Sequence, residues 1–215
     1  MRAGYFVGIG FFITLALAAC QTWLPLWSLL HGPRLRECPG ALFPTQEIPD
    51  GFRLHQRIRI RAEKVSVGLE TVAQKHGDEF VLIGLNSMGA KVFAVRQRGL
   101  EIEVKEFMGR AFPVPPRNVL YDLHRELFFR VPREPVQDGD FRSLAGGVEI
   151  TEEWRKGRPR RRVFHRPGEA EADAVVLEFA ADTPPGTTAS VHLRNPVCGY
   201  EAAIVTLLET VPERK

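Results

Sequence analysis

Cysteine, serine and paired histidine are scarce in this chain of 215 residues, and their scarcity excludes several kinds of site. Three cysteines are too few for a disulfide-dense miniprotein or a four-cysteine zinc site. None of the six histidines lies three or four positions from another, so the sequence predicts no metal site. The five serines include no Gly-x-Ser-x-Gly motif, and no nucleophile, base and orienting group occur together. We therefore expect neither an enzyme nor a cofactor.

Acidic residues are absent before Glu37, and the apolar run over residues 5–17 is shorter than the ~20 residues that span a membrane. This pattern is typical of a secretory signal peptide. The run ends in Leu17-Ala18-Ala19-Cys20, which resembles the lipobox of bacterial lipoproteins. That resemblance implies cleavage after residues 1–19 and acylation of Cys20, whose several acyl chains would anchor the protein to a membrane. The alternative is a retained signal anchor.

Export sets the compartment and narrows the range of partners. In enteric lipoproteins an aspartate after the lipidated cysteine favours the inner membrane; Gln21 stands there instead, so we expect the outer membrane, facing the periplasm. The formal net charge of +3 is too small to indicate nucleic acid, and export argues against it further. Cys38 and Cys198 are the only other cysteines, and they would lie in an oxidising compartment. We predict a disulfide between them, with two separate thiols as the alternative.

Residues 20–50 are predicted to form a tether and residues 51–212 a folded domain. Five prolines interrupt any regular element in the tether, namely Pro25, Pro33, Pro39, Pro44 and Pro49. Trp23 and Trp27 make its first part apolar, so this part either lies at a membrane interface or packs on the domain.

The domain is rich in short segments of period two, which is the pattern of half-buried strands. In the first of them Leu54, Ile58 and Ile60 alternate with Arg57 and Arg59. We predict ten strands, at 54–62, 65–69, 80–85, 91–96, 100–105, 148–154, 161–166, 174–180, 188–193 and 202–210. The connections are too short for parallel crossovers, so the strands should form an antiparallel sheet.

One helix is predicted over residues 118–129, followed by a loop over residues 132–147. Val119, Leu120, Leu123 and Leu127 fall on one face of this helix, and Asp122, Arg125 and Glu126 fall on the opposite face. Because a sheet of ten strands curls, the predicted fold class is mainly β (α+β), a curved antiparallel sheet or incomplete barrel closed by a helical segment.

Such a sheet encloses an apolar space that is either packed core or a ligand cavity. Ten inward residues are candidates for its lining: Leu54, Ile58, Ile60, Val67, Leu82, Val92, Val95, Ile102, Leu120 and Leu123. Val92 and Val95 have opposite parity along one strand, so only a bulge would turn both inward.

A basic run near residues 155–166 is a candidate contact for anionic lipid head groups, through Arg158, Arg160, Arg161 and Arg162. The alternative is a solvated hairpin tip. Arg57, Arg59 and Arg61 form a second basic row, and the lipid interpretation gains weight if the two rows meet.

The segment from Val81 to Val95, VLIGLNSMGAKVFAV, resembles a family of uncharacterised bacterial outer-membrane lipoproteins that is often encoded near aryl-polyene biosynthesis genes. In that family a strand ending in a Gly-Leu-like pair meets a glycine turn and then a strand with a phenylalanine. Its members look like the outer-membrane receptor LolB. The resemblance implies an incomplete barrel that binds acyl chains, and a partner similar to the periplasmic carrier LolA. In this sequence the turn carries only Met88 as an apolar tip, where LolB has an apolar membrane-inserting loop.

Two functions follow from these observations. The first is a lipoprotein that binds acyl chains or lipidated cargo in an apolar cavity and delivers it to the membrane. The alternative is a non-enzymatic scaffold lipoprotein that binds another envelope protein through an exposed edge or apolar patch.

Overall fold

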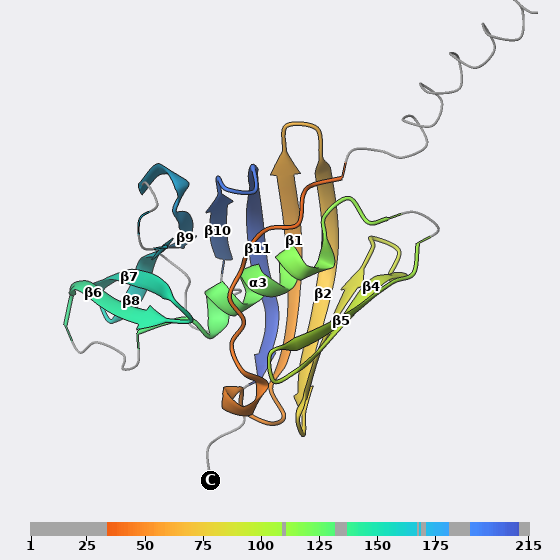
Figure 1. The fold of residues 1–215 in the computed structure, drawn as a ribbon, viewed down its shortest axis with the longest axis horizontal. Coiled ribbons are helices and arrows are strands. Elements are labelled where there is room, and N and C mark those ends of the chain that lie inside the picture. Colours follow the sequence, from red (N-terminus) through yellow and green to blue (C-terminus); the bar gives the residue numbers. More distant parts are fainter. Residues whose placement is uncertain are drawn as a thin grey trace, which may run out of the picture. The chain divides into compact units, whose positions relative to one another are not determined.

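The computed structural model describes residues 34–108, 111–131, 137–166, 168, 171–180 and 190–210. These residues form one open antiparallel sheet of eleven strands with a single α-helix against it (Figure 1). The strands are β1 (Arg53–Ala62), β2 (Ser66–His76), β3 (Glu79–Leu85), β4 (Lys91–Arg98), β5 (Glu101–Glu106), β6 (Gly139–Ala145), β7 (Val148–Arg155), β8 (Arg158–His165), β9 (Val175–Phe179), β10 (Ser190–Asn195) and β11 (Tyr200–Thr210). The helix is α3 (Pro116–Leu127), and two 3-10 turns are η1 (Thr45–Glu47) and η2 (Glu171–Asp173).

The sheet consists of two meanders that meet at a single non-sequential pair. Its strand order is β5-β4-β3-β2-β1-β11-β10-β9-β8-β7-β6, so every neighbour except β1 and β11 follows directly along the chain. Ala62 lies opposite Tyr200 and Arg53 opposite Thr210 in that pair. The predicted fold class, a curved antiparallel sheet that does not close and carries a helix, is confirmed.

Alternation along the strands defines an inner face, which α3 covers, and an outer face. In β1 the side chains of Leu54, Ile58 and Ile60 are buried, while those of Arg57 and Arg59 are exposed. This is the pattern that period two predicts. The arginines of β1 therefore lie on the outer face, whereas Gln56 lies on the inner face among the buried side chains.

The prediction of a loop over residues 132–147 is wrong for its second half, because β6 occupies Gly139–Ala145. β6 lies at one edge of the sheet and pairs only with β7. Leu144, one of its few apolar residues, is 72% exposed, so apolar residues do not alternate along this strand. An edge strand with so little burial lacks the periodic signal on which the prediction depends.

The conflict between Val92 and Val95 is resolved by a bulge. Gly84 lies opposite Phe93 and Leu85 opposite Lys91, so Val92 is an extra residue without a partner on β3. Both Val92 and Val95 are therefore buried.

α3 begins at a proline and lies between the sheet and the segment that precedes β1. Pro116 occupies the first turn, where its missing N–H is not needed. Val119, Leu120 and Leu123 are buried as expected, but Asp122, Arg125 and Glu126 are buried too. The amphipathic pattern thus indicates the helix correctly, but its polar face is not a solvent face.

A covering segment, residues 34–52, packs on the side of α3 that faces away from the sheet. The Asn118 side chain donates to the carbonyl of Arg36, and that of Arg125 donates to the carbonyl of Pro39. The backbone N–H of Phe43 donates to Nδ1 of His124. Arg34–Lys215 forms a compact unit, so residues 34–50 of the predicted tether belong to the folded part.

No helix among the residues described is long and apolar enough to cross a membrane. The predicted signal peptide and Cys20 lie outside those residues.

Candidate functional site

The ten predicted lining residues come together on the inner face and on α3. Leu54, Ile58, Ile60, Leu82, Val92, Val95, Leu120 and Leu123 are buried in one hydrophobic cluster, and Val67 and Ile102 are partly buried against it. The inner face is therefore one continuous apolar surface that α3 covers. In this structure the side chains of the cluster pack against one another.

Phenylalanines fill much of the space between sheet and helix, which the sequence analysis did not anticipate. Phe52, Phe80 and Phe93 are almost fully buried. The rings of Phe80 and Phe128 have centroids 6.1 Å apart, and those of Phe52 and Phe128 are 5.6 Å apart. The 14 phenylalanines of the chain indicate an aromatic core, but their positions in the sequence do not show which rings contact one another.

The apolar interior reaches the surface at a hollow beyond the C-terminal end of α3. Its apolar walls are formed by Ala41, Phe129, Ala145, Val148, Phe164, Val175 and Val197. Polar residues also line it, including Arg125, Arg166, Asp173 and Asn195. Its volume is about 40 Å³, which is room for no more than a few water molecules at ~10–15 Å³ each. The hollow admits a small group and widens only if its walls move.

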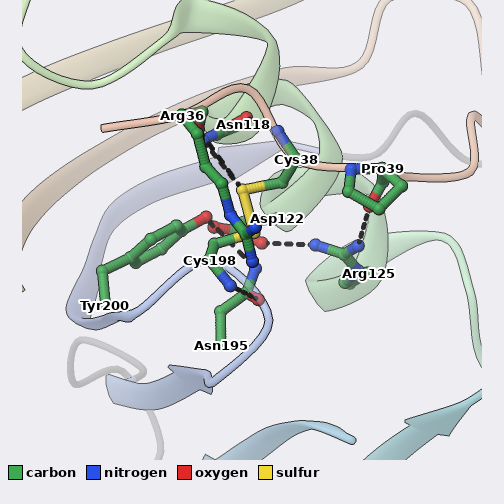
Figure 2. A network of polar contacts seen from close by, with 9 residues as sticks. All are labelled: Arg36, Cys38, Pro39, Asn118, Asp122, Arg125, Asn195, Cys198 and Tyr200. Carbon is green, nitrogen blue, oxygen red and sulfur yellow. Dashed lines mark hydrogen bonds and ion pairs between the residues drawn. A yellow bond between two sulfur atoms is a disulfide. The ribbon is translucent and has the colours of Figure 1, made fainter. Parts of the chain in front are cut away.

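A polar network ties α3 to the covering segment and to β11 (Figure 2). Asp122 accepts a hydrogen bond from the Tyr200 hydroxyl and forms an ion pair of 2.7 Å with Arg125. Burial raises the pKa of Asp122, and the positive charge of Arg125 opposes that shift. Because its partners are complete, this network stabilises one position of the helix.

The predicted disulfide between Cys38 and Cys198 is present beside this network, with their Cα atoms 5.9 Å apart. Asn118 fixes the segment that carries Cys38: its Oδ1 accepts from the Cys38 N–H, and its Nδ2 donates to Sγ and to the Arg36 carbonyl. On the other side, the Cys198 N–H donates to Asn195 Oδ1. The disulfide therefore joins the covering segment to the turn between β10 and β11.

Glu126 is a buried carboxyl group that the sequence analysis assigned to the polar face of the helix. Gln56 Nε2 donates to both of its oxygens, at 2.9 and 3.0 Å, and also to the hydroxyl of Thr206. Burial raises its pKa to about 7, and the negative charge of Glu209 adds to this shift. Glu126 therefore titrates near neutral pH at the contact between α3 and the centre of the sheet.

His124 stands on the same helix but remains neutral. Its Nδ1 accepts from the Phe43 N–H, so the other ring nitrogen, Nε2, carries the proton. Burial lowers its pKa to about 3. Its ring packs edge-on to those of Phe80 and Phe128, which makes it part of the aromatic core.

Arg162 is placed differently from the other three arginines of the predicted head-group contact. Its side chain is 3% exposed and pairs with the buried Glu152, and its Nη1 donates to the carbonyls of Arg125 and Glu126 at the end of α3. Arg162 is therefore an interior group and lies away from any head group at the surface. Its orientation follows from alternation, since its neighbour Arg161 lies on the outer face.

The remaining arginines of this run, Arg158, Arg160 and Arg161, are exposed or half-buried on the β7–β8 hairpin. The second basic row, Arg57, Arg59 and Arg61, lies on the outer face of β1. Three strands, β9, β10 and β11, separate β8 from β1, so the two rows share a face but do not meet.

Among the described residues, no group of three or more histidine, cysteine or acidic side chains is arranged to hold a metal ion. Most polar groups near α3 have structural partners, although Nε2 of His124 and Oε1 of Gln56 are buried without one in the part of the chain that the structure describes, and the apolar surface is the larger feature. The site is thus suited to apolar contact.

These features define a class of protein: a mainly β domain whose open antiparallel sheet is covered on its inner face by one helix. The family described as "Protein of unknown function (DUF3261)" matches residues 53–208, from the first residue of β1 almost to the end of β11. The chain belongs to this family. No curated protein matches it.

Proposed function

We propose that the protein is a lipid-anchored protein of the bacterial outer membrane that binds acyl chains or lipidated cargo on the inner face of its sheet. Cys20 would carry the anchor, and a LolA-like periplasmic carrier would be the donor of the cargo. The lipobox at the end of a short apolar run supports the anchor. The likeness to LolB suggests the cargo.

The observation that carries the proposal is the cover of the inner face. A continuous apolar surface across the sheet is closed by one 12-residue helix and a covering segment instead of a second sheet. α3 packs on the sheet through Val119, Leu120 and Leu123 and is tied to both layers by side-chain hydrogen bonds. One helix buries less apolar area than a second sheet would, so less free energy opposes its displacement. A helix held in this way can move and expose the surface beneath it.

The hollow at the end of α3 is where an acyl chain would begin to enter. It opens onto Phe129 and Phe164, which are buried, and its other apolar walls are small or branched side chains. Each methylene that leaves water contributes ~0.8 kcal/mol, so a long chain can offset the displacement of the aromatic side chains. Arg125, Arg166 and Asp173 also line the hollow. Arg125 is paired with Asp122, so Arg166 is the residue proposed to contact an anionic head group.

Arg158, Arg160 and Arg161 are proposed as a further contact with anionic head groups during delivery. They lie on the β7–β8 hairpin, which is next to β6 in the sheet. Residues of β6, β7 and β8 line the hollow. Attraction to an anionic surface is worth up to ~1 kcal/mol per basic residue.

A fluorescent fatty acid, cis-parinaric acid, tests the proposal directly. Ala145→Trp would fill the hollow, whereas Leu144→Trp adds the same side chain next to it at a position that is 72% exposed. We expect the wild type and Leu144→Trp to bind with similar affinity. Ala145→Trp should bind at least about 10-fold more weakly, because a 10-fold loss corresponds to the free energy of burying one or two methylene groups. Equal binding by both variants would exclude the hollow as the route.

The enclosed volume of about 40 Å³ favours a second candidate, a scaffold that binds a protein partner. For this function the outer face is the relevant surface. Val72, Val81 and Ile83 line an open hollow there, on β2 and β3. A wild-type protein that binds no fatty acid, and loses its co-purifying partner on Val72→Glu but not on Leu100→Glu, would support the scaffold.

A further inference from the structure

A row of polar side chains crosses the apolar inner face of the sheet. Thr71 on β2, Gln56 on β1 and Thr206 on β11 lie directly opposite one another in the strand register. Thr71 and Gln56 are fully buried, and Thr206 is 9% exposed. Polar side chains are seldom buried to this extent, so three of them on neighbouring strands require a reason. We call these three residues the polar row.

Two atoms of the polar row lack a hydrogen-bond partner. The Nε2 atom of Gln56 donates to Glu126 and to Thr206. The Oε1 atom of the same amide and Oγ1 of Thr71 are buried, and neither has a partner among the residues that the structure describes. Because Gln56 and Thr71 are directly opposite on neighbouring strands, their Cβ atoms are about 5 Å apart. A group that pairs with both atoms would relieve the cost of burying them unpaired.

The chemistry of these two atoms defines the group that fits them. An amide oxygen only accepts hydrogen bonds, whereas a threonine hydroxyl can donate one. A hydroxyl group of a ligand can therefore donate to Oε1 of Gln56 and accept from Oγ1 of Thr71. A carboxylate has no proton to donate, and it would lie near the carboxyl group of Glu126, which binds the same amide. The pair is thus suited to a neutral hydroxyl group.

Apolar side chains flank the polar row on both sides. Leu54 and Ala73 are opposite each other on one side of it, and Ile58 and Leu69 are opposite each other on the other side. All four are buried. Each of these pairs is two residues from the polar row, a distance of about 7 Å along the strands. An alkyl chain that lies along β1 and β2 would therefore have apolar contacts before and after the row, which places the hydroxyl group within the chain.

An aromatic ring limits the row beyond Thr71. Gly84 on β3 lies opposite Thr71, and Phe93 on β4 lies opposite Gly84. The ring of Phe93 occupies the space in which a side chain at position 84 would stand. The polar part of the surface therefore ends at Thr71, and the unpaired atoms of Thr71 and Gln56 form its last pair.

We propose that the inner face selects acyl chains that carry a hydroxyl group within the chain, and that this hydroxyl group binds between Gln56 and Thr71. The inference rests on acyl binding in the proposed function and deepens it, because it names the class of chain. The chain reaches the polar row when α3 moves away from the sheet. Recognition requires only hydrogen bonds and apolar contact.

Displacement of cis-parinaric acid from the mature protein measures this selectivity. The two competitors are 12-hydroxyoctadecanoic acid and octadecanoic acid, which differ only in the hydroxyl group. We expect the wild type to bind the hydroxy acid about 10-fold more tightly, because the unsubstituted chain leaves both protein atoms unpaired. Thr71→Val should bind the two acids within about twofold of each other. Thr206→Val is the matched control and should keep the preference, since its hydroxyl group already accepts from Gln56.

Equal affinities in the wild type, or a preference that survives in Thr71→Val, would overturn the proposal. Urea denaturation without ligand gives a second measurement. Thr71→Val should not lower the midpoint, because it removes a buried hydroxyl group that has no partner in the described part of the chain. A lower midpoint would show that this hydroxyl group is already engaged, and would overturn the proposal as well.

Failure of this inference is distinguishable from failure of the proposed function. A wild type that binds both acids equally retains acyl binding and lacks only the selectivity. A wild type that binds neither acid contradicts acyl binding itself, and with it the selectivity.

Discussion

At the scale of single residues, Arg162 shows how a charged side chain can be a core group. It pairs with Glu152, which also accepts from the indole N–H of Trp154, and it caps two carbonyls at the end of α3. A buried charge is tolerated only when it is paired and fully hydrogen-bonded. The guanidinium meets this condition because its fork reaches a carboxylate and two carbonyls together.

Replacing Arg162 should therefore be far more costly than replacing its neighbour. We expect Arg162→Gln to lower the free energy of unfolding by about 3–5 kcal/mol, because it leaves the Glu152 carboxylate buried and unpaired. Arg161→Gln, one position away on the outer face, should change it by less than about 0.5 kcal/mol. Urea denaturation of both variants measures the difference, and similar values would show that the buried pair contributes little.

The residue scale also marks the limit of prediction from the sequence. Period two correctly identified β1 and the burial of Leu54, Ile58 and Ile60, because alternation is a local property of a strand. The burial of Asp122 and Glu126 was not predictable, because Tyr200 and Gln56, their partners, are 78 and 70 positions away. A polar residue on an amphipathic helix carries no local sign that such a partner exists.

At the scale of elements, α3 is the part whose position depends most on ionisation. The amide group of Gln56 on β1 donates both to Glu126 and to Thr206 on β11. Glu209, Arg162 and Asp122 are the charged groups that influence the pKa of Glu126. Ionisation of this carboxyl group near pH 7 places a negative charge between helix and sheet. The contact between α3 and the sheet should then weaken as the pH rises.

The free energy of unfolding should show this effect with a defined sign. The pKa of Glu126 is about 7 in the folded state and 4.5 in the unfolded chain, so the folded state holds the proton more tightly. The protonated carboxyl group contributes fully to the free energy of unfolding below pH ~4.5. This contribution falls between pH ~4.5 and ~7 and is lost above pH ~7. Between pH 5 and 8 the free energy of unfolding should therefore fall by about 1–3 kcal/mol less in Glu126→Gln than in the wild type.

Urea denaturation across this pH range makes the measurement. Glu149→Gln, at a half-buried position on β7 where the carboxylate pairs with Arg142, is the control and should keep the wild-type slope. A Glu126→Gln variant with an unchanged slope would assign the pH dependence to other groups, of which Asp122 and Glu209 have raised pKa values.

The covering segment is a second element whose position depends on one covalent bond. The disulfide closes a loop of 160 residues, for which the chain-entropy account gives a stabilisation of up to about 5 kcal/mol. Cys38→Ala with Cys198→Ala should lower the free energy of unfolding by a few kcal/mol and increase hydrogen exchange in residues 34–52. A thiol reductant should have the same effect on the wild type and none on the variant.

Elements without a strong local period were harder to predict. The helix was found because Val119, Leu120 and Leu123 repeat at helical spacing, although it begins two residues earlier than predicted, at Pro116. β6 was missed because it lies at an edge and Leu144 points to solvent. The sequence indicated only that a bulge is needed if both Val92 and Val95 point inward. It cannot show that Val92 is the residue without a partner.

At the scale of the whole molecule, the sheet joins two meanders through β1 and β11, and α3 lies where the two halves meet. The sequence predicted an open sheet with a helical cover because its connections are short and its strands many. It did not predict how full the interior is, which depends on the packing of Phe52, Phe80 and Phe93. The function therefore depends on whether this interior opens.

Native mass spectrometry of the mature chain, exported to an oxidising periplasm with Cys20 replaced, tests that question most directly. We expect a bound acyl species, either co-purified or acquired from envelope lipids, that is lost in Ala145→Trp and kept in Leu144→Trp. A mass without ligand after incubation with envelope lipids, in protein whose disulfide is intact, would contradict acyl binding on the inner face.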